Sequence, residues 1–191
     1  YEYQVVEGVP VLLVNEKLNK QENNQKVWFE KHYAKFSKEG YFLEDWRLSM
    51  LERIFGCVFG NKIKTYLDIG CGATGYTVIE AAKRNNWLSF GVDISVEAMI
   101  RAKRLSEKQK VGGKTAFIVC SAENLPFKQE VIDFVSAISL LEHLKYDDRV
   151  VSSVLKILKK KGLFYVCVPN TYRKMWTFLW PSYWYFDKKI G

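Results

Sequence analysis

The chain has 191 residues, of which 48% are hydrophobic and 26% are charged, and its formal net charge at pH 7 is +8. This length and composition suit one globular domain, and the four cysteines, which form no C-x-x-C pair, are expected to be buried, reduced thiols rather than disulfides or zinc ligands. No apolar run approaches the roughly 20 residues of a membrane span and no signal peptide pattern is present, so we expect a cytoplasmic protein.

The first 60 residues precede the regular part of the pattern. We interpret residues 1–24 as an N-terminal extension, a remnant of a small preceding domain. Residues 25–60 are expected to hold two amphipathic leading helices, over 25–36 and 41–59. Ordinary core packing is the favoured role for these helices, on the sheet or over its ligand end.

From residue 65 onward, apolar strand patterns alternate with helical patterns. Helices are expected over 77–84 and 95–108, and a long helix is expected to run to about Lys160, where Gly162 stops it. Strands are expected over residues 65–69, 88–94, 115–120, 131–139 and 163–169. Near-continuously apolar strands separated by helices predict an α/β fold, a Rossmann-like doubly wound parallel sheet that binds ligands at the carboxyl ends of its strands.

The stretch YLDIGCGATGY lies at the end of the first of these strands. Its glycines form G-x-G-x-x-G and Asp93 ends the next strand, as in sites for dinucleotides, but other adenosine ligands fit the same pattern. Asp68 separates these alternatives. A carboxylate beside a pyrophosphate would be repelled by about 1 kcal/mol or more, whereas a cationic or amine-bearing ligand would be attracted.

Four segments together resemble one family: LDIGCGATG, FGVDIS, SAENLPF and IDFVSAISLLEHL. In order and spacing they are similar to the class I S-adenosylmethionine-dependent methyltransferases, most of all to the branch with the ubiquinone and menaquinone biosynthesis methyltransferases. The resemblance covers about residues 63–170 and implies a cofactor-binding core over 61–170 with strand order 3-2-1-4-5. The usual C-terminal hairpin of strands 6 and 7 is expected to be missing, and the domain to continue beyond residue 191.

The resemblance also implies S-adenosylmethionine as the cofactor and a role for each matching residue. Asp68, Gly70 and Gly72 would line its methionine end, Asp93 would accept both ribose hydroxyls, and Ile94 would lie against the adenine face. The residues implied in cofactor binding are Asp68, Gly70, Cys71, Gly72, Gly75, Asp93, Ile94, Ala122 and Glu123 at the adenine edge, and Ser139 through its carbonyl.

Two departures from the family pattern bear on this expectation. Ala73 and Thr74 lengthen the usual G-x-G-x-G loop by one residue, which leaves open which amides face the cofactor. Ser121 stands where the family often has an aspartate, so the contact with the adenine amine is expected to be weaker or to shift to Glu123.

His143 and Glu142 are the candidate catalytic residues, with His143 as a base or substrate contact. Some related O-methyltransferases hold magnesium with E-x-x-E-H, but Ser139 replaces the first carboxylate here, so no metal site is expected. A packed structural role for His143 is the favoured alternative.

We expect methyl transfer by in-line displacement to a small-molecule or lipid-linked acceptor. The alternatives are an NAD-type oxidoreductase and a non-catalytic cofactor-binding partner subunit. Residues 171–191 combine aromatic and basic side chains, which fits core packing or peripheral membrane contact. The net positive charge also fits nucleic-acid binding, but solvated helix faces are the favoured explanation.

Overall fold

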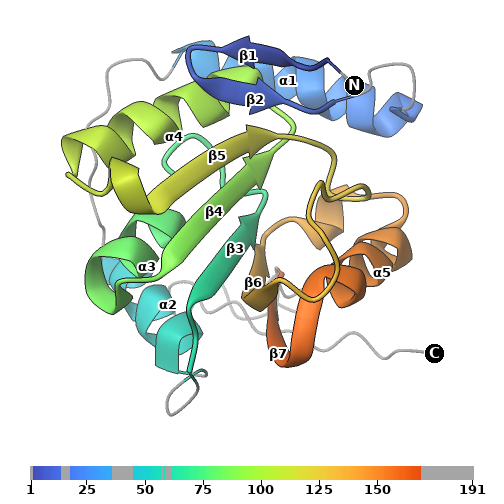
Figure 1. The fold of residues 1–191 in the computed structure, drawn as a ribbon. Coiled ribbons are helices and arrows are strands. Elements are labelled where there is room, and N and C mark those ends of the chain that lie inside the picture. Colours follow the sequence, from blue (N-terminus) through green and yellow to red (C-terminus); the bar gives the residue numbers. More distant parts are fainter. Residues whose placement is uncertain (1, 14–17, 36–44, 57, 59–61, 169–191) are drawn as a thin grey trace, which may run out of the picture.

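The computed structural model describes residues 2–13, 18–35, 45–56, 58 and 62–168, with side chains omitted for 32–35 and 45–47. Over these residues, seven strands form one sheet in the order β1-β2-β5-β4-β3-β6-β7 (Figure 1). The strands are β1 (Gln4–Val6), β2 (Val9–Val11), β3 (Thr65–Ile69), β4 (Leu88–Asp93), β5 (Thr115–Val119), β6 (Ile132–Ile138) and β7 (Leu158–Cys167). The α-helices are α1 (Lys20–Lys35), α2 (Asp45–Gly56), α3 (Tyr76–Asn85), α4 (Val96–Lys108) and α5 (Asp147–Ile157).

The predicted fold class is wrong in its strand content. It gave five strands in the order 3-2-1-4-5 with a strand pair missing, whereas the described part of the chain forms a seven-stranded sheet. The strands expected over 131–139 and 163–169 are β6 and β7, which pair in parallel. The two strands that the prediction lacked are the antiparallel pair β1 and β2, at the opposite edge of the sheet. The Rossmann-like α/β architecture itself is present.

The strands β1 and β2 form a hairpin, and β2 joins the sheet by backbone pairing with β5. Glu7 and Gly8 both have positive φ, of 49° and 75°, as a tight two-residue hairpin turn requires. Val11 then pairs with Val119, and the N–H of Leu12 donates to the Val119 carbonyl at 2.8 Å. Residues 4–11 therefore extend the main sheet, and the origin of residues 1–24 as the remnant of a preceding domain stays a prediction.

Helices cover both faces of the sheet, with α2, α3 and α4 on one side and α5 on the other (Figure 1). The strands are buried on both faces, which explains their continuous apolar pattern. Along β3, Tyr66 packs with the α2 side and Leu67 and Ile69 pack with α5. Side chains at alternate positions of β3 therefore serve different layers, and Asp68 shares the face of Tyr66.

The predicted strands and helices of the core agree with the structure within a few residues, with one exception. The helix expected to run to Lys160 ends at Ile157, and β7 begins at Leu158. Lys159 pairs with Asp133 at 2.8 Å, and a register shift between Ile132 and Phe134 admits the extra residues before Leu163. Residues 158–161 continue the helical pattern in the sequence, but pairing of Leu158 with Ile132 and the ion pair of Lys159 with Asp133 place them in β7.

Helix α1 begins earlier than predicted because Asn19 and Glu22 cap it. The Asn19 side chain accepts hydrogen bonds from the N–H groups of Gln21 and Glu22, each at 3.0 Å, and Glu22 accepts from the N–H of Asn19 at 2.9 Å. This reciprocal capping box starts the helix at Lys20. No helix in the described ranges is both long and apolar enough to span a membrane, and the cytoplasmic location stays a prediction.

Candidate functional site

A cavity of about 170 Å³ lies at the carboxyl ends of the central parallel strands. We call it the ligand-end cavity. Residues at or just beyond the ends of β3, β4, β5 and β6 line it, and residues of α1 form part of its wall. Its lining residues are Glu22, Gln25, Phe29, Ile69, Gly70, Val92, Asp93, Ile94, Cys120, Ala122, Ser139, Leu140, His143 and Leu144.

The glycine turn, residues 70–75, folds back over the end of β4. The N–H groups of Gly70 and Cys71 both donate to the Val92 carbonyl, at 2.8 and 3.1 Å. Gly70, Gly72 and Gly75 have φ values of 71°, 63° and 50°, which L side chains rarely adopt. The glycines are therefore required by the conformation of the turn.

The members of the turn differ in what they face. Gly70 lines the ligand-end cavity, and a Cβ atom there would lie 2.9 Å from the Leu140 side chain. A Cβ atom on Gly75 would instead lie 2.7 Å from Phe117. Cys71, Gly72 and Gly75 are not among the lining residues. Their predicted cofactor contacts stay predictions, and their visible role is to shape the turn.

Asp93 lies where β4 ends and brings a carboxylate to the cavity. Its Oδ2 accepts a hydrogen bond from the N–H of Gly72 at 3.1 Å, and its Oδ1 accepts one from the N–H of Ser95 at 3.0 Å. Burial raises the pKa of Asp93 to about 6, against the lowering effect of these backbone hydrogen bonds. A carboxylate offers about four acceptor sites, so Asp93 can still accept from a ligand hydroxyl.

Asp68 lies in a buried polar environment, and its contact with the methionine end of the cofactor stays a prediction. It is 3% exposed and is absent from the cavity lining. Its carboxylate accepts hydrogen bonds from the hydroxyls of Thr77 and Ser136, and Ser136 also contacts the Tyr66 hydroxyl at 2.6 Å. Asp68 therefore ties the start of α3 to β6 underneath the glycine turn. Burial raises its pKa to about 6, although both hydroxyls lower it.

This burial predicts a pH dependence of stability that Asp68→Asn removes. The folded pKa of about 6 lies above the ordinary value near 4. The contribution of Asp68 to the unfolding free energy is therefore highest below pH 4 and falls as the pH rises through 6. The share of Asp68 is on the order of 3 kcal/mol. In urea unfolding between pH 4 and 7.5, Asp68→Asn should gain stability relative to the original protein by about that amount.

Asp133→Asn is the matched control for this experiment. Asp133 accepts hydrogen bonds from the N–H groups of Lys64 and Thr65 and from Lys159, and its pKa is lowered to about 2 despite partial burial. Its stabilising contribution is lost only as pH falls below about 4. The stability difference between Asp133→Asn and the original protein should therefore be flat from pH 5 to 7.5. A flat difference for Asp68→Asn as well would contradict the prediction.

Helix α1 supplies lining residues that sequence reasoning missed, namely Glu22, Gln25 and Phe29. Three sets of polar contacts hold the helix over the ends of the strands. Glu22 accepts from the Ser121 hydroxyl at 2.5 Å, Gln21 and Gln25 donate to the carbonyl of His143, and Glu30 accepts from the N–H of Val96 at 2.7 Å. The capping box of Asn19 and Glu22 was the sequence signal for this helix, but not for its position.

The remaining predicted residues are partly brought together. Ile94, Ala122, Ser139 and His143 line the cavity, and Ser139 has a strained φ of 50° at the end of β6. Glu123 and Glu142 are not among the lining residues. The side chain of His143 is 52% exposed and lies 3.9 Å from Glu142. The catalytic roles of His143 and Glu142 stay predictions.

Comparison with known proteins identifies the family. The model of a methyltransferase domain matches residues 67–166, more than half of the chain, and these residues include the glycine turn, Asp93 and the end of β6. The chain belongs to this methyltransferase family. The resemblance to the class I S-adenosylmethionine-dependent methyltransferases is thereby confirmed.

Individual relatives of this methyltransferase domain act on different compounds. Norajmaline N-methyltransferase of Rauvolfia serpentina is 31% identical over 97 residues, which cover 51% of this chain and 33% of that enzyme. The mitochondrial ubiquinone biosynthesis O-methyltransferase of Candida albicans is 30% identical over 116 residues, which cover 59% and 35%. The chain spans a third to a half of the length of the first curated relatives that it matches.

Among solved structures, a geranyl diphosphate C-methyltransferase of Streptomyces coelicolor A3(2) superposes with a TM-score of 0.65. The match covers 78% of this chain and 65% of that one, at 12% sequence identity. At this identity the likeness supports the fold alone.

Proposed function

We propose that this methyltransferase domain binds S-adenosylmethionine in the ligand-end cavity and transfers its methyl group to a small-molecule acceptor by in-line displacement. The observation that carries the proposal is the carboxylate of Asp93 beside a glycine turn, at one cavity where four parallel strands end. A carboxylate accepts two hydrogen bonds from a vicinal diol such as ribose, and the apolar lining suits a purine.

Asp68 favours this cofactor over a dinucleotide. Its carboxylate holds the hydroxyl of Thr77, the second residue of α3, so negative charge already lies at the positive end of that helix. A pyrophosphate bound there would be repelled. A cationic sulfonium with an attached amino acid would not be.

The acceptor is proposed by analogy with relatives. The Streptomyces structure contains S-adenosylhomocysteine with geranyl diphosphate, and the curated relatives carry names of small-molecule methyltransferases. When bound, S-adenosylmethionine supplies the reactive methyl group, so the chain's own part is to orient the cofactor and to exclude water. A lipid-linked acceptor is the finer form of this proposal.

Equilibrium binding tests the proposal. Titration calorimetry with S-adenosylhomocysteine should give a dissociation constant in the micromolar range, on the order of 8 kcal/mol of binding free energy, and NAD should give no measurable heat. Incubation of extracts with isotope-labelled S-adenosylmethionine and mass spectrometry would then identify the acceptor. Binding of NAD without S-adenosylhomocysteine would overturn the proposal in favour of an oxidoreductase. Cofactor binding without any labelled product would favour a non-catalytic subunit.

A further inference from the structure

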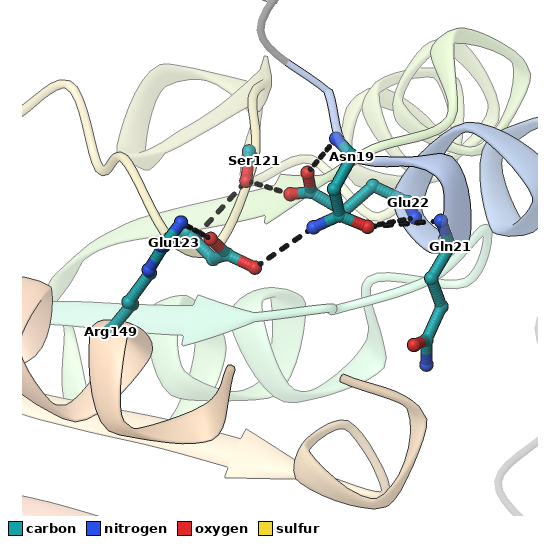
Figure 2. A network of polar contacts seen from close by, with 6 residues as sticks. All are labelled: Asn19, Gln21, Glu22, Ser121, Glu123 and Arg149. Carbon is teal, nitrogen blue, oxygen red and sulfur yellow. Dashed lines mark hydrogen bonds and ion pairs between the residues drawn. The ribbon is translucent and has the colours of Figure 1, made fainter. Parts of the chain in front are cut away.

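The carboxylate of Glu22 is buried, although Glu22 belongs to α1, a helix outside the sheet. Glu22 is 6% exposed and lines the ligand-end cavity. Its Oε1 accepts from the Ser121 hydroxyl at 2.5 Å, and its Oε2 accepts from the N–H of Asn19 at 2.9 Å (Figure 2). Each oxygen therefore keeps a lone pair for a further donor.

Two carboxylates line this cavity, Asp93 and Glu22. Asp93 follows β4, and Glu22 is bonded to Ser121, just beyond the neighbouring strand β5. Strands in a sheet lie about 4.8 Å apart, so an adenosine whose ribose binds Asp93 extends its base across the end of β5. Ile94 and Ala122 line the cavity in that direction. Glu22, bonded to Ser121 beyond β5, is the lining carboxylate on that side of the cavity.

A third carboxylate lies nearby, that of Glu123 in the loop after β5, and it already has hydrogen-bond partners. Glu123 accepts from Arg149 at 3.3 Å and from the side-chain amide of Asn19 at 3.4 Å, and it does not line the ligand-end cavity (Figure 2). The N–H of Glu123 donates to Ser121, whose hydroxyl holds Glu22. The contacts around Ser121 thus fix the position of the Glu22 carboxylate.

We infer that Glu22 is the residue that recognises the adenine base, by accepting a hydrogen bond from its exocyclic amino group. This inference rests on the proposed function and adds to it a residue outside the sheet. Because Glu22 belongs to α1, recognition of the base and closure of α1 over the cavity are one event. A base with a keto group at that position would place oxygen against the carboxylate and be rejected.

The test compares two ligands rather than one affinity. S-Inosylhomocysteine is S-adenosylhomocysteine with a keto oxygen in place of the amino group and a hydrogen on the neighbouring ring nitrogen N1. The original protein should bind S-adenosylhomocysteine more tightly by about 10- to 100-fold. Glu22→Gln keeps one acceptor oxygen, for the Ser121 hydroxyl or for the N–H of Asn19, and replaces the other oxygen with an amide donor that can face the keto oxygen. The preference should therefore fall below about 5-fold.

Glu30→Gln is the matched control, since Glu30 also lies on α1 and accepts from the N–H groups of Val96 and Glu97 but does not line the cavity. It should retain the preference of the original protein even where α1 is loosened. An unchanged preference in Glu22→Gln, or a similar loss in Glu30→Gln, would overturn the inference and leave the proposed function intact. Failure of the original protein to bind S-adenosylhomocysteine would overturn both.

Discussion

Replacing Asp93 with alanine is expected to lower the affinity for S-adenosylhomocysteine by about 100-fold or more. Hydrogen bonds to charged groups are worth about 1.5–3 kcal/mol each, and two ribose hydroxyls would lose their acceptor. The N–H groups of Gly72 and Ser95 would lose theirs as well, which loosens the glycine turn. Titration calorimetry at pH 7.5 measures the effect.

The pH profile gives this prediction a second readout. Because the pKa of Asp93 is about 6 in the structure, the affinity should fall by up to about tenfold per pH unit below pH 6, as the carboxylate takes up a proton. In Asp93→Asn this step should be absent. Glu107→Gln, which removes an exposed ion pair with Lys103 on α4, should change neither quantity. An Asp93→Ala protein that binds within about threefold of the original would contradict the proposed site.

Gly75→Ala is expected to lower the unfolding free energy by about 3 kcal/mol. Its φ of 50° penalises any L side chain by about 1–2 kcal/mol, and the new Cβ atom would lie 2.7 Å from Phe117 and 3.0 Å from Ala102. Inserting a methyl group into such a packed region adds about 1–3 kcal/mol. In thermal unfolding the midpoint should fall by about 10 °C for a chain of this size.

Gly113→Ala is the control, because a Cβ atom on Gly113 would meet nothing within 4 Å. Its stability should stay within about 0.5 kcal/mol of the original. Phe117→Leu replaces the contacting ring with a smaller side chain, so in a double-mutant cycle it should offset part of the cost of Gly75→Ala. A Gly75→Ala protein as stable as Gly113→Ala would contradict the packing explanation.

The strand ends could be predicted from the sequence because the parallel α/β pattern is local and strong. It correctly predicted the positions of Gly70, Asp93 and Ser139 at the ends of β3, β4 and β6, and the structure places all three at one cavity. Ser95, a residue type favoured at helix N-caps, caps α4, since its side chain accepts from the N–H of Ala98.

Features that depend on tertiary contacts could not be read in the same way. Residues 4–11 carry no signal for pairing with β5, and the polar side chains that fix α1 at Ser121 and His143 are ordinary in sequence. The side of β3 on which Asp68 lies could have been found. Strand side chains alternate, so Asp68 shares a face with Tyr66 and points to α3 rather than into the cavity.

The attachment of α1 also has a consequence for the kinetics of exchange. Helix α1 forms part of the wall of the ligand-end cavity, so a ligand held under it through Glu22 would leave after α1 has lifted. Lifting breaks the contacts at Ser121, His143 and Val96 together. If this opening of α1 is slower than release of the ligand, ligands of quite different affinity would dissociate at similar rates.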